Sequence, residues 1–445
     1  MSEAVPETPS PEGLSFNRVA PIFALTLVDV LGLTVILPLL HLYAIQFGAS
    51  PLQIGLVAAT FPLSQLVGVP VMGALSDRYG RKPLLLISQI TTCISFIMLA
   101  FAGSLEMVIL SRVVDGLFGA NLSTAQAAIT DVTDESNRAR GLGLTGAAFG
   151  IGFIFGPIIS LVALEVGGSL AIPALTAAVY SFISILLTLF VFKETLPTEK
   201  RGKTRHGRVI SLTTLAKYLG MSHVRVLLVL LFAEQFIFFG FEAFMGTFTL
   251  SKLGFLGQGN AILFLIIGTI LVTVQVRYIG KWVMRYGERN LLIAALFLLS
   301  IGLFLVATTP TQPHPFYVQV NVAYDLSKQS VGSTQAIFGD LSISLPSNGQ
   351  NGIVGVLWFI VALVPLSIGA SLVRPNANSL LTKLVSSEEF GSILGISASV
   401  VSFANALAPI VCGFLFQQLG ASAPFWLGAV GMALLAIVSQ RLIKR

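Results

Sequence analysis

Ionisable side chains lie inside several of the long apolar stretches of this 445-residue chain. They include Asp29, the pair Arg112 and Asp115, and the two glutamates Glu234 and Glu242. A charge in the hydrocarbon region costs about 2.5–3.5 kcal/mol on insertion scales, so each residue requires a partner or a function. A carboxylate at such a depth can bind and release a proton, and we regard these five residues as candidates for proton coupling.

Arg112 and Asp115 are three residues apart and therefore share one face of a helix. A nearby guanidinium favours the ionised form of a carboxylate, so movement of Arg112 relative to an acid could switch the protonation of that acid. The alternative is static, with the pair neutralising itself and tying helices together. Asp29 has a similar alternative, a contact to a backbone or hydroxyl group. The residues alone leave both alternatives open.

The face of Arg112 continues through Gly119, Ser123 and Gln126 at helical spacing, which predicts that it looks into a cavity or onto a neighbouring helix. Polar and aromatic residues on this and two later predicted helices are our candidates for a substrate cavity: Asn121, Gln126, Gln235, Phe238, Arg374 and Asn378.

The composition excludes a soluble protein, because 55% of the residues are hydrophobic, only 10% are charged and the mean hydropathy is +0.88. A soluble domain carries roughly a quarter charged residues. Cys93 and Cys412 both lie in apolar runs, which argues against a disulfide framework or a metal site. The sequence contains no P-loop, HExxH or nucleophile elbow, so an enzyme is disfavoured.

Apolar runs of about 20 residues are long enough to cross a bilayer core of about 30 Å. We therefore predict an all-α polytopic membrane protein of twelve transmembrane helices in two pseudo-symmetric six-helix bundles. The predicted spans are 18–44, 53–75, 83–103, 105–130, 140–164, 170–193, 224–250, 259–280, 290–309, 353–384, 390–419 and 422–442.

The spans divide the chain into a tail at 1–17, a first bundle at 18–193, a linker at 194–223 and a second bundle at 224–442. The linker contains a mildly amphipathic stretch at 209–220, which is compatible with a helix on the membrane surface, and a solvated linker without a regulatory role is the alternative. The polar insert at 310–352 is expected to be a mobile external loop.

The basic residues predict the orientation. Of 26 lysines and arginines, only Lys252 and Lys328 fall in loops on one side, and only Arg112 and Arg374 lie within helices. The side with the remaining ones is expected to be cytoplasmic, and an even number of spans places both termini there. Because these residues are spread over short loops, we expect no binding to nucleic acid. We expect residence in a prokaryotic plasma (inner) membrane.

A short charged loop, Gly73-Ala-Leu-Ser-Asp77-Arg78-Tyr-Gly80-Arg81-Lys82, separates the second and third apolar runs. It has an echo after the eighth predicted span, Gly280-Lys-Trp-Val-Met-Arg285-Tyr-Gly287-Glu288-Arg289. Two related halves are typical of transporters with a central site between the halves.

The fifth predicted span contains closely spaced glycines, of which Gly152 and Gly156 precede Pro157. Small residues four apart permit close helix packing, and a proline bends a helix. Packing alone and a hinge for gating explain this spacing equally well.

Together these segments resemble the major facilitator superfamily, and in particular its twelve-helix, tetracycline-efflux-like branch of drug:proton antiporters. The resemblance rests on the loop at 73–86, on Ile109-Leu-Ser-Arg112-Val-Val-Asp-Gly116, on Gly152-Phe-Ile-Phe-Gly156-Pro157, and on Asp29 followed by Pro38. It implies that Arg112 influences a proton-carrying acid. It also implies a conformational lock against the start of the eleventh helix, which stabilises the outward-facing state and comprises Gly73, Asp77, Arg78, Gly80, Arg81 and Lys82.

The function that the resemblance implies is secondary active transport, as proton-coupled efflux of a small amphipathic compound or drug by alternating access. The expected partners are the small-molecule substrate, protons and the lipid bilayer, and the expected functional unit is a monomer. A proton gradient would supply the energy, without a cofactor. The alternatives are proton-coupled or passive transport of a metabolite, and a non-transporting membrane sensor on the same fold.

Overall fold

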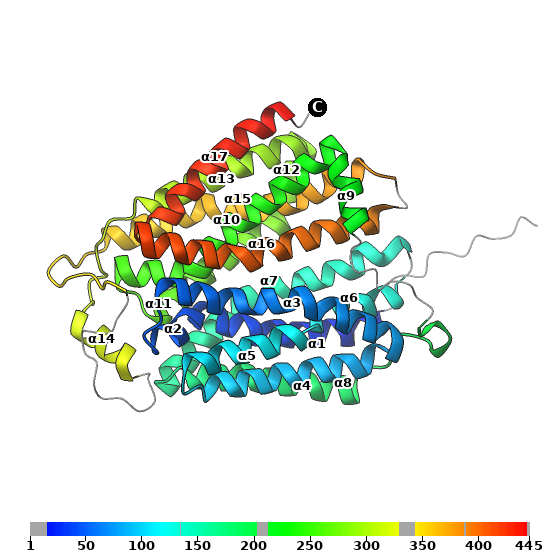
Figure 1. Cartoon of the computed structure of the whole chain (residues 1–445), viewed down its shortest axis with the longest axis horizontal. Coiled ribbons are helices and arrows are strands. Elements are labelled where there is room, and N and C mark those ends of the chain that lie inside the picture. The colour runs from blue at the N-terminus through cyan, green and yellow to red at the C-terminus, as the bar shows by residue number, and fades with distance from the viewer. Residues whose placement is uncertain (1–15, 134, 203–211, 329–342, 387–388, 443–445) are drawn as a thin grey trace, which may run out of the picture.

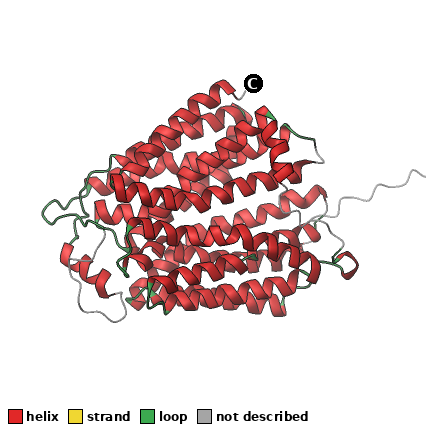
Figure 2. Ribbon diagram, in the orientation of Figure 1, coloured by secondary structure: helices red, strands yellow, loops and turns green. Residues whose placement is uncertain are grey.

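The computed structural model describes residues 16–133, 135–202, 212–328, 343–386 and 389–442. All regular secondary structure in these ranges is helical (Figure 2). In a membrane this follows from the composition, because a helix satisfies its backbone hydrogen bonds within one segment.

The first half comprises α1 (Phe16–Ile36), η1 (Leu37–Leu39), α2 (Leu40–Ile45), α3 (Pro51–Tyr79), α4 (Arg81–Ala100), α5 (Leu105–Phe118), α6 (Asn121–Asp131), α7 (Glu135–Gly167) and α8 (Ala171–Phe190). Between the halves lie η2 (Thr198–Lys200) and α9 (Leu212–Gly220). The second half comprises α10 (Ser222–Leu253), α11 (Gly257–Thr273), η3 (Val274–Tyr278), α12 (Ile279–Tyr286), α13 (Glu288–Ala307), α14 (Gln319–Lys328), α15 (Val354–Lys383), α16 (Phe390–Leu419) and α17 (Ala423–Leu442).

Eleven helical stretches of the described residues are long and apolar enough to cross a membrane, and each corresponds to one predicted span. The remaining predicted span, 105–130, is formed by two shorter helices, α5 and α6, which are separated at Gly119 and Ala120. The prediction of one continuous helix was wrong at this point. With this divided span the twelve-helix prediction is confirmed.

The two halves pack in the same way (Figure 1). In the first half α1 packs on α7 and α4 packs on α8, whereas in the second half α10 packs on α16 and α13 packs on α17. Contacts between the halves join α3 to α16 and α7 to α11. Two six-helix bundles related by pseudo-symmetry result, with the first bundle below the second in Figure 1.

The starts of α4 and α13 show the sequence repeat as matching contacts. Lys82 Nζ donates to the carbonyl oxygens of Leu189 (2.9 Å) and Phe192 (2.8 Å) at the end of α8. Arg289 Nη2 donates to the carbonyl oxygen of Gln440, near the end of α17, at 2.8 Å. Cationic side chains at helix C-termini satisfy free carbonyl groups. Equivalent positions of the repeat therefore hold equivalent helices in each bundle.

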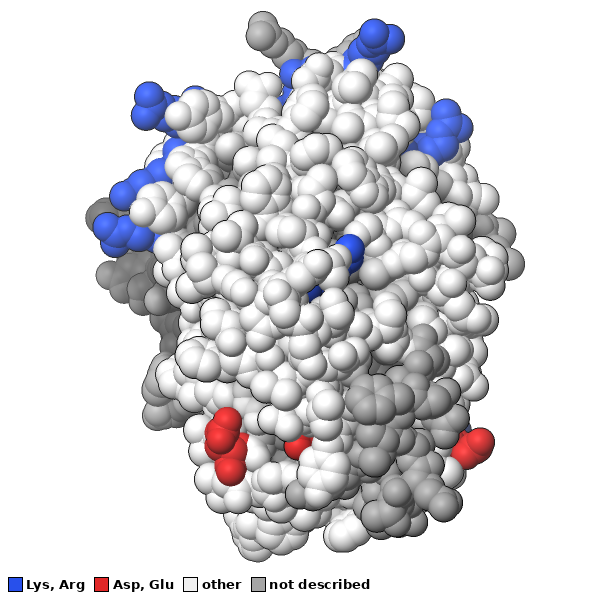
Figure 3. All heavy atoms as spheres, turned by 90° about the vertical axis from the view of Figure 1, so that its left-hand side faces the viewer, with Lys and Arg blue, Asp and Glu red and all other residues white. Residues whose placement is uncertain are grey.

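The molecule has two distinct ends, which we name after the short helices there: the α14 end and the α9 end (Figure 1). The distribution of lysine and arginine predicts that the α9 end is cytoplasmic. Figure 3 looks onto the α14 end, whose visible surface is mostly uncharged.

The part of the insert around His314 and Tyr317 is packed against the end of α10 in the second bundle. Tyr317 is 2% exposed, and its hydroxyl donates to the carbonyl oxygen of Pro346 at 2.8 Å. The amide of His314 donates to the carbonyl oxygen of Leu253, at the end of α10, at 3.0 Å. The prediction of a mobile loop was wrong for these residues, because a polar composition did not reveal that a buried tyrosine fastens the segment. Residues 329–342 lie outside the described ranges.

The predicted surface helix of the linker corresponds to α9, while 203–211 lie outside the described ranges. Tyr218 of α9 is buried, and Lys217 forms an ion pair with Glu389, immediately before α16. The Lys217 ammonium holds the pKa of the Glu389 carboxyl below its usual range, so the pair is lost only when the pH falls through that lowered pKa. The linker helix is thus fastened to the second bundle.

Candidate transport site

Ser88 of α4 stabilises the break between α5 and α6. Its hydroxyl donates to the carbonyl oxygen of Phe118 at 2.6 Å and accepts from the amide of Ala120 at 2.8 Å. Backbone groups that a break frees inside a membrane must be satisfied by protein. Discontinuous helices commonly border the binding sites of transporters, so this break marks a candidate site in the first bundle.

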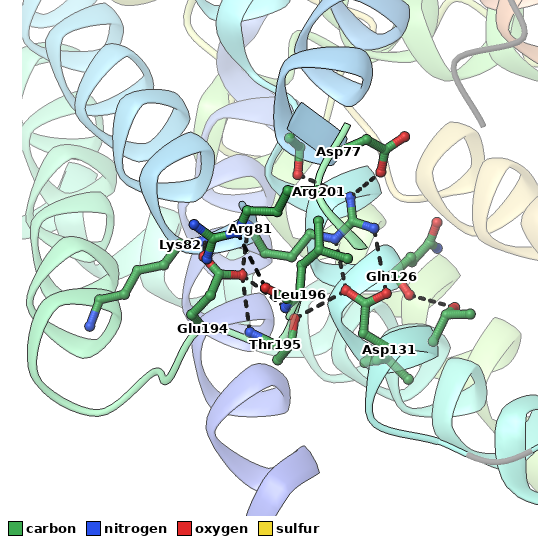
Figure 4. A network of polar contacts seen from close by, with 12 residues as sticks. Asp77, Arg81, Lys82, Gln126, Asp131, Glu194, Thr195, Leu196 and Arg201 are labelled. Atoms are coloured by element: carbon green, nitrogen blue, oxygen red, sulfur yellow. Dashed lines mark hydrogen bonds and ion pairs between the residues drawn. The ribbon is translucent and has the colours of Figure 1, made fainter. Parts of the chain in front are cut away.

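The break also ends the polar stripe that we predicted along one helix face. Asn121 is the first residue of α6, and its side-chain oxygen is buried without a hydrogen bond in the described part of the chain. Gln126 lies close to the charged residues of the α9 end (Figure 4). Neither residue lines the cavity of the second bundle described below, so the predicted cavity residues form two groups.

Arg112 and Asp115 form a buried pair that faces α4, with Arg112 Nη1 3.3 Å from Asp115 Oδ2. Arg112 Nη2 donates to Ser95 Oγ at 2.9 Å, and Thr92 Oγ1 donates to Asp115 Oδ1 at 2.9 Å. The guanidinium carbon lies 5.4 Å from the centre of the Phe96 ring. A pair that is satisfied on both sides favours the static alternative for these two residues.

Asp29 of α1 differs from this pair. Both of its carboxyl oxygens are buried, and neither forms a hydrogen bond within the described residues. The polar side chains that act on it are Gln89 and Ser184, which bind each other at 2.7 Å. An ionised carboxylate without a partner is costly in such a place, so the protonated form suits this conformation. Asp29 is consequently the strongest candidate for a proton carrier in the first bundle.

A cavity of about 330 Å³ lies between α10, α11, η3 and α15 in the second bundle. It combines apolar and aromatic surface with an acid, a base and amide groups. Its lining consists of Glu234, Gln235, Phe238, Leu271, Gln275, Ala370, Arg374, Pro375 and Asn378. The structure therefore brings four of the predicted cavity residues together with one of the proton-coupling candidates.

Glu234 and Arg374 face this cavity from α10 and α15 without an ion pair within 4.0 Å. Gln235 Nε2 donates to Asn405 Oδ1 at 2.8 Å, and Asn378 Oδ1 accepts from Ser397 Oγ at 2.8 Å. These two amides are fixed by α16, whereas the two charged groups remain available to a ligand. Such a mixture of apolar walls and few placed polar groups is typical of small-molecule sites.

Two further residues complete the description of this region. Gln275 was not singled out from the sequence, because nothing in Val274-Gln-Val-Arg-Tyr278 predicts that these residues form a π-helical turn. Such turns are frequent at functional sites.

Glu242 lies four residues beyond Phe238 on α10, is partly buried, and has no hydrogen bond or ion pair among the described residues.

The charged loop after α3 binds within its own bundle (Figure 4). Arg81 Nη1 lies 2.6 Å from Asp77 Oδ1, and Arg81 Nε lies 2.8 Å from Asp131 Oδ2 at the end of α6. Arg78 stacks over Tyr79. In the described residues Asp77 thus pairs with Arg81 and not with α16. The resemblance assigns the lock against the eleventh helix to the outward-facing state, and the lock stays a prediction.

Glu194 is a residue of this network that the sequence did not reveal. Its Oε1 accepts from the amide of Arg81 at 2.9 Å, and its Oε2 accepts from the amide of Lys82 at 3.1 Å. A carboxylate there compensates the positive end of the α4 helix dipole. Gly80, with φ +108°, is required beside it, because a Cβ would lie 2.4 Å from Glu194 Oε2. Gly73, in contrast, has open space around it.

Glu194→Gln is expected to lower the free energy of unfolding by about 1–2 kcal/mol, because charged hydrogen bonds to a helix N-terminus are replaced by weaker neutral ones. A thermal melt in detergent measures this effect. Cys93 is partly buried and Cys412 is buried, so unfolding exposes both thiols and increases their reactivity. Glu199→Gln, at an exposed position of the same segment, is the control and should leave the Tm unchanged. Equal melting of both variants would contradict the capping role.

The glycines predicted as a hinge pack within the first bundle. A Cβ at Gly152 would lie 2.5 Å from Val30 Cγ1, and one at Gly156 would lie 2.2 Å from Thr34 Oγ1, both on α1. Pro157 lies inside the continuous helix α7. The packing explanation accounts for both glycines, and the hinge role stays a prediction.

The two bundles approach each other most closely in the half toward the α14 end. A Cβ at Gly55 of α3 would lie 2.2 Å from the carbonyl oxygen of Pro409 of α16, and one at Gly413 would lie 2.5 Å from that of Pro51. One cluster of buried apolar residues includes the segment around α2 as well as the end of α10, and so crosses between the bundles here.

The opposite half is more open. Gly146 of α7 and Gly395 of α16 are exposed and have no neighbouring atom within 4 Å of an added Cβ. The buried apolar clusters around Ile22 and Met72 belong to the first bundle alone. The bundles therefore close at the α14 end and are more open toward the α9 end.

This arrangement of two bundles around cavity-lining polar residues agrees with a comparison of the sequence with protein families. The family model described as Major Facilitator Superfamily matches residues 22–354. The chain belongs to this superfamily. It is accordingly an integral, multi-pass membrane transporter and not an enzyme.

Curated relatives of this superfamily member span nearly its whole length. Tetracycline resistance protein, class B, of Escherichia coli is 25% identical over 421 residues, which cover 93% of this chain and 92% of the relative. Multidrug resistance protein 1 of Bacillus subtilis (strain 168) is 24% identical, with 92% and 91% covered.

Solved structures support the major facilitator fold. The human organic anion transporter MFSD10 (TETRAN) has a TM-score of 0.65 and 21% identity, and covers 95% of this chain and 99% of its own. The nucleoside transporter NupG has a TM-score of 0.73 and 14% identity, with 96% and 100% covered. At these identities the likeness concerns the fold alone.

Proposed function

We propose that this transporter exports a small amphipathic compound in exchange for protons by alternating access. The observation that carries the proposal is the buried Asp29 carboxyl group, which has no hydrogen bond among the described residues. The side chains that act on this carboxyl group, Gln89 and Ser184, are neutral, so no opposite charge explains why an acid is kept in this membrane helix, and proton transfer supplies a reason. The relatives named for tetracycline and multidrug resistance support efflux.

The bundles are closed at the α14 end, which we assign to the outside, so the conformation faces inward. A substrate enters the cavity of the second bundle from the cytoplasm, and Phe238 and Leu271 offer it apolar surface. Glu234 and Arg374 offer opposite charges to its polar part.

The proton follows the opposite route. In the conformation that is open to the outside, the substrate leaves and Asp29 takes a proton. The protonated chain then returns to the inward-facing conformation, in which Asp29 is buried and neutral. Substrate binding favours release of the proton to the cytoplasm. The proton gradient is thus the energy source, and each chain contains both bundles and a cavity, so it acts as a monomer.

The placement in the membrane follows from the charge distribution. The α9 end and both termini lie in the cytoplasm, and the conformational lock of Asp77 with the start of α16 forms when the α9 end closes. The membrane is the plasma (inner) membrane of a prokaryotic cell.

Proteoliposomes that contain the purified protein and a pH-sensitive dye test the proposal. Tetracyclines, lipophilic cations and metabolites are added in turn, with protein-free liposomes as control. We expect proton movement in response to an amphipathic drug. A response to a metabolite alone would replace drug efflux by metabolite transport. No response from folded protein to any compound would contradict coupled transport and favour a non-transporting role.

A further inference from the structure

His41 of α2 lies between the two bundles at the α14 end and is 5% exposed. Its Nε2 lies 3.2 Å from Asn260 Nδ2 of α11. Asn260 Oδ1 accepts from Thr249 Oγ1 of α10 at 2.7 Å. Thr249 Oγ1 also lies 3.1 Å from the carbonyl oxygen of Gly246, but Asn260 Oδ1 is its shorter contact. We therefore assign the hydroxyl proton to Asn260 Oδ1, which places the amide nitrogen toward the ring and makes His41 Nε2 the acceptor of a neutral imidazole. Three polar side chains thus join the first bundle to two helices of the second.

The ring is also enclosed by the backbone of α10. A Cβ at Gly246 would lie 2.3 Å from His41 Cε1 and 2.5 Å from His41 Nδ1. The imidazole therefore occupies the place of a side chain on α10. Any separation of the bundles at this end must withdraw the ring from Gly246 and Asn260.

Within the described ranges, no charged group forms an ion pair with this ring. The helix α11 contains no Asp, Glu, Lys or Arg between Gly257 and Thr273. In the described chain no hydrogen bond or ion pair joins His41 to any titratable group of its own segment, of the helices α3, α5 and α10 that pack on α2, or of α7 and α8 in the same bundle. The groups of these elements nearest this end are Tyr43, Glu106, Glu165, Glu242 and Lys252.

We propose that His41 is a further proton-binding residue of the transport cycle, which acts at the outer gate. The neutral ring closes the gate by accepting from Asn260. An imidazolium in the same place would present a second donor to the Asn260 amide and would lack an anionic partner, which is unfavourable in an apolar interface.

In the open state the ring is exposed to external water and binds a proton readily. Protons therefore bind the open state more tightly than the closed state, and acid outside shifts the population toward opening. This inference rests on two parts of the proposed function: that the α14 end faces the outside, and that the protein works by alternating access. It places the first encounter with an external proton at the gate, before Asp29.

A distance between spin labels across the gate tests the inference directly. Glu106→Cys in the first bundle and Leu419→Cys in the second are both exposed at the α14 end, in a background with Cys93→Ser and Cys412→Ser. The pH is lowered from about 7.5 to about 5.5, the range in which an imidazole titrates. We expect the population with the longer distance to increase several-fold. A second pair within the first bundle, Glu106→Cys with Val166→Cys, should show no change.

Two variants separate proton binding from a merely structural role. His41→Gln retains an amide at the gate but does not titrate, so the response to pH should disappear. Asn260→Asp provides an anion for the imidazolium in the closed state, so the gate should stay closed at acid pH. The Glu106→Cys with Val166→Cys pair shows whether each variant is folded. If one variant does not give the unchanged distance of this pair, the other variant alone is used for the test.

A wild-type gate that does not respond to pH would overturn the inference, as would either folded variant with an undiminished response. The measurement needs neither a substrate nor proton flux. Failure at the gate would therefore leave the proposed coupled efflux untouched, and failure of the flux assay would leave the gate measurement valid.

Discussion

Asp29→Asn is expected to abolish substrate-driven proton movement and to preserve substrate counterflow. Asparagine has nearly the shape of aspartate but cannot carry a proton. Asp29 has no ion pair among the described residues, and the side chains that act on it, Gln89 and Ser184, are neutral, so the change leaves no charge unpaired and should not unfold the protein. Proteoliposomes measure both quantities: the pH-sensitive dye should remain at the level of protein-free liposomes, and labelled substrate should still exchange.

Asp115→Asn provides a matched control, since it removes the charge of another buried aspartate. Here the charge of Arg112 is left without its partner, which destabilises a buried pair by about 3–5 kcal/mol. We expect a lower Tm for this variant and an intact Tm for Asp29→Asn. Full proton movement in Asp29→Asn would contradict our assignment and move the proton carrier to Glu234 or Glu242.

Gly55→Leu is expected to abolish transport by preventing closure of the α14 end. A Cβ at this position would lie 2.2 Å from the carbonyl oxygen of Pro409, and neither backbone can move away while the bundles are in contact. The variant should fold, because the clash occurs between the bundles and not within one. The spin-label pair at Glu106 and Leu419 should show the longer distance at neutral pH.

Gly103→Leu is the control for this substitution. Gly103 precedes α5 at the same end of the molecule and has no atom within 4 Å of an added Cβ. It should transport at the rate of the unmodified protein. Normal transport by Gly55→Leu would mean that the close contact of α3 with α16 is not part of the cycle.

Features that repeat along the chain could be predicted from the sequence. Hydropathy located every span, because the bilayer sets a length and a composition for each helix. The echo of the 73–82 loop at 280–289 predicted two related bundles, and the structure shows its consequence in Lys82 and Arg289.

Features that depend on distant partners could not be predicted. The break after Phe118 is stable because Ser88, on another helix, satisfies its backbone groups. Glu194 follows the sixth span as an ordinary acidic residue, and only the fold places it at the start of α4. The pairing of Asp115 with Arg112 was visible in the sequence, but the Thr92 hydroxyl that binds Asp115 and the neutral surroundings of Asp29 depend on the fold.

The most direct test of coupled efflux is the direction of substrate movement under an imposed pH gradient. Protein is reconstituted in one orientation, and the drug that triggers proton movement is followed with its own concentration equal on both sides. We predict that the drug moves in the direction opposite to the proton flow and therefore accumulates on the more acidic side. Accumulation in the direction of the proton flow, or none at all, would contradict antiport.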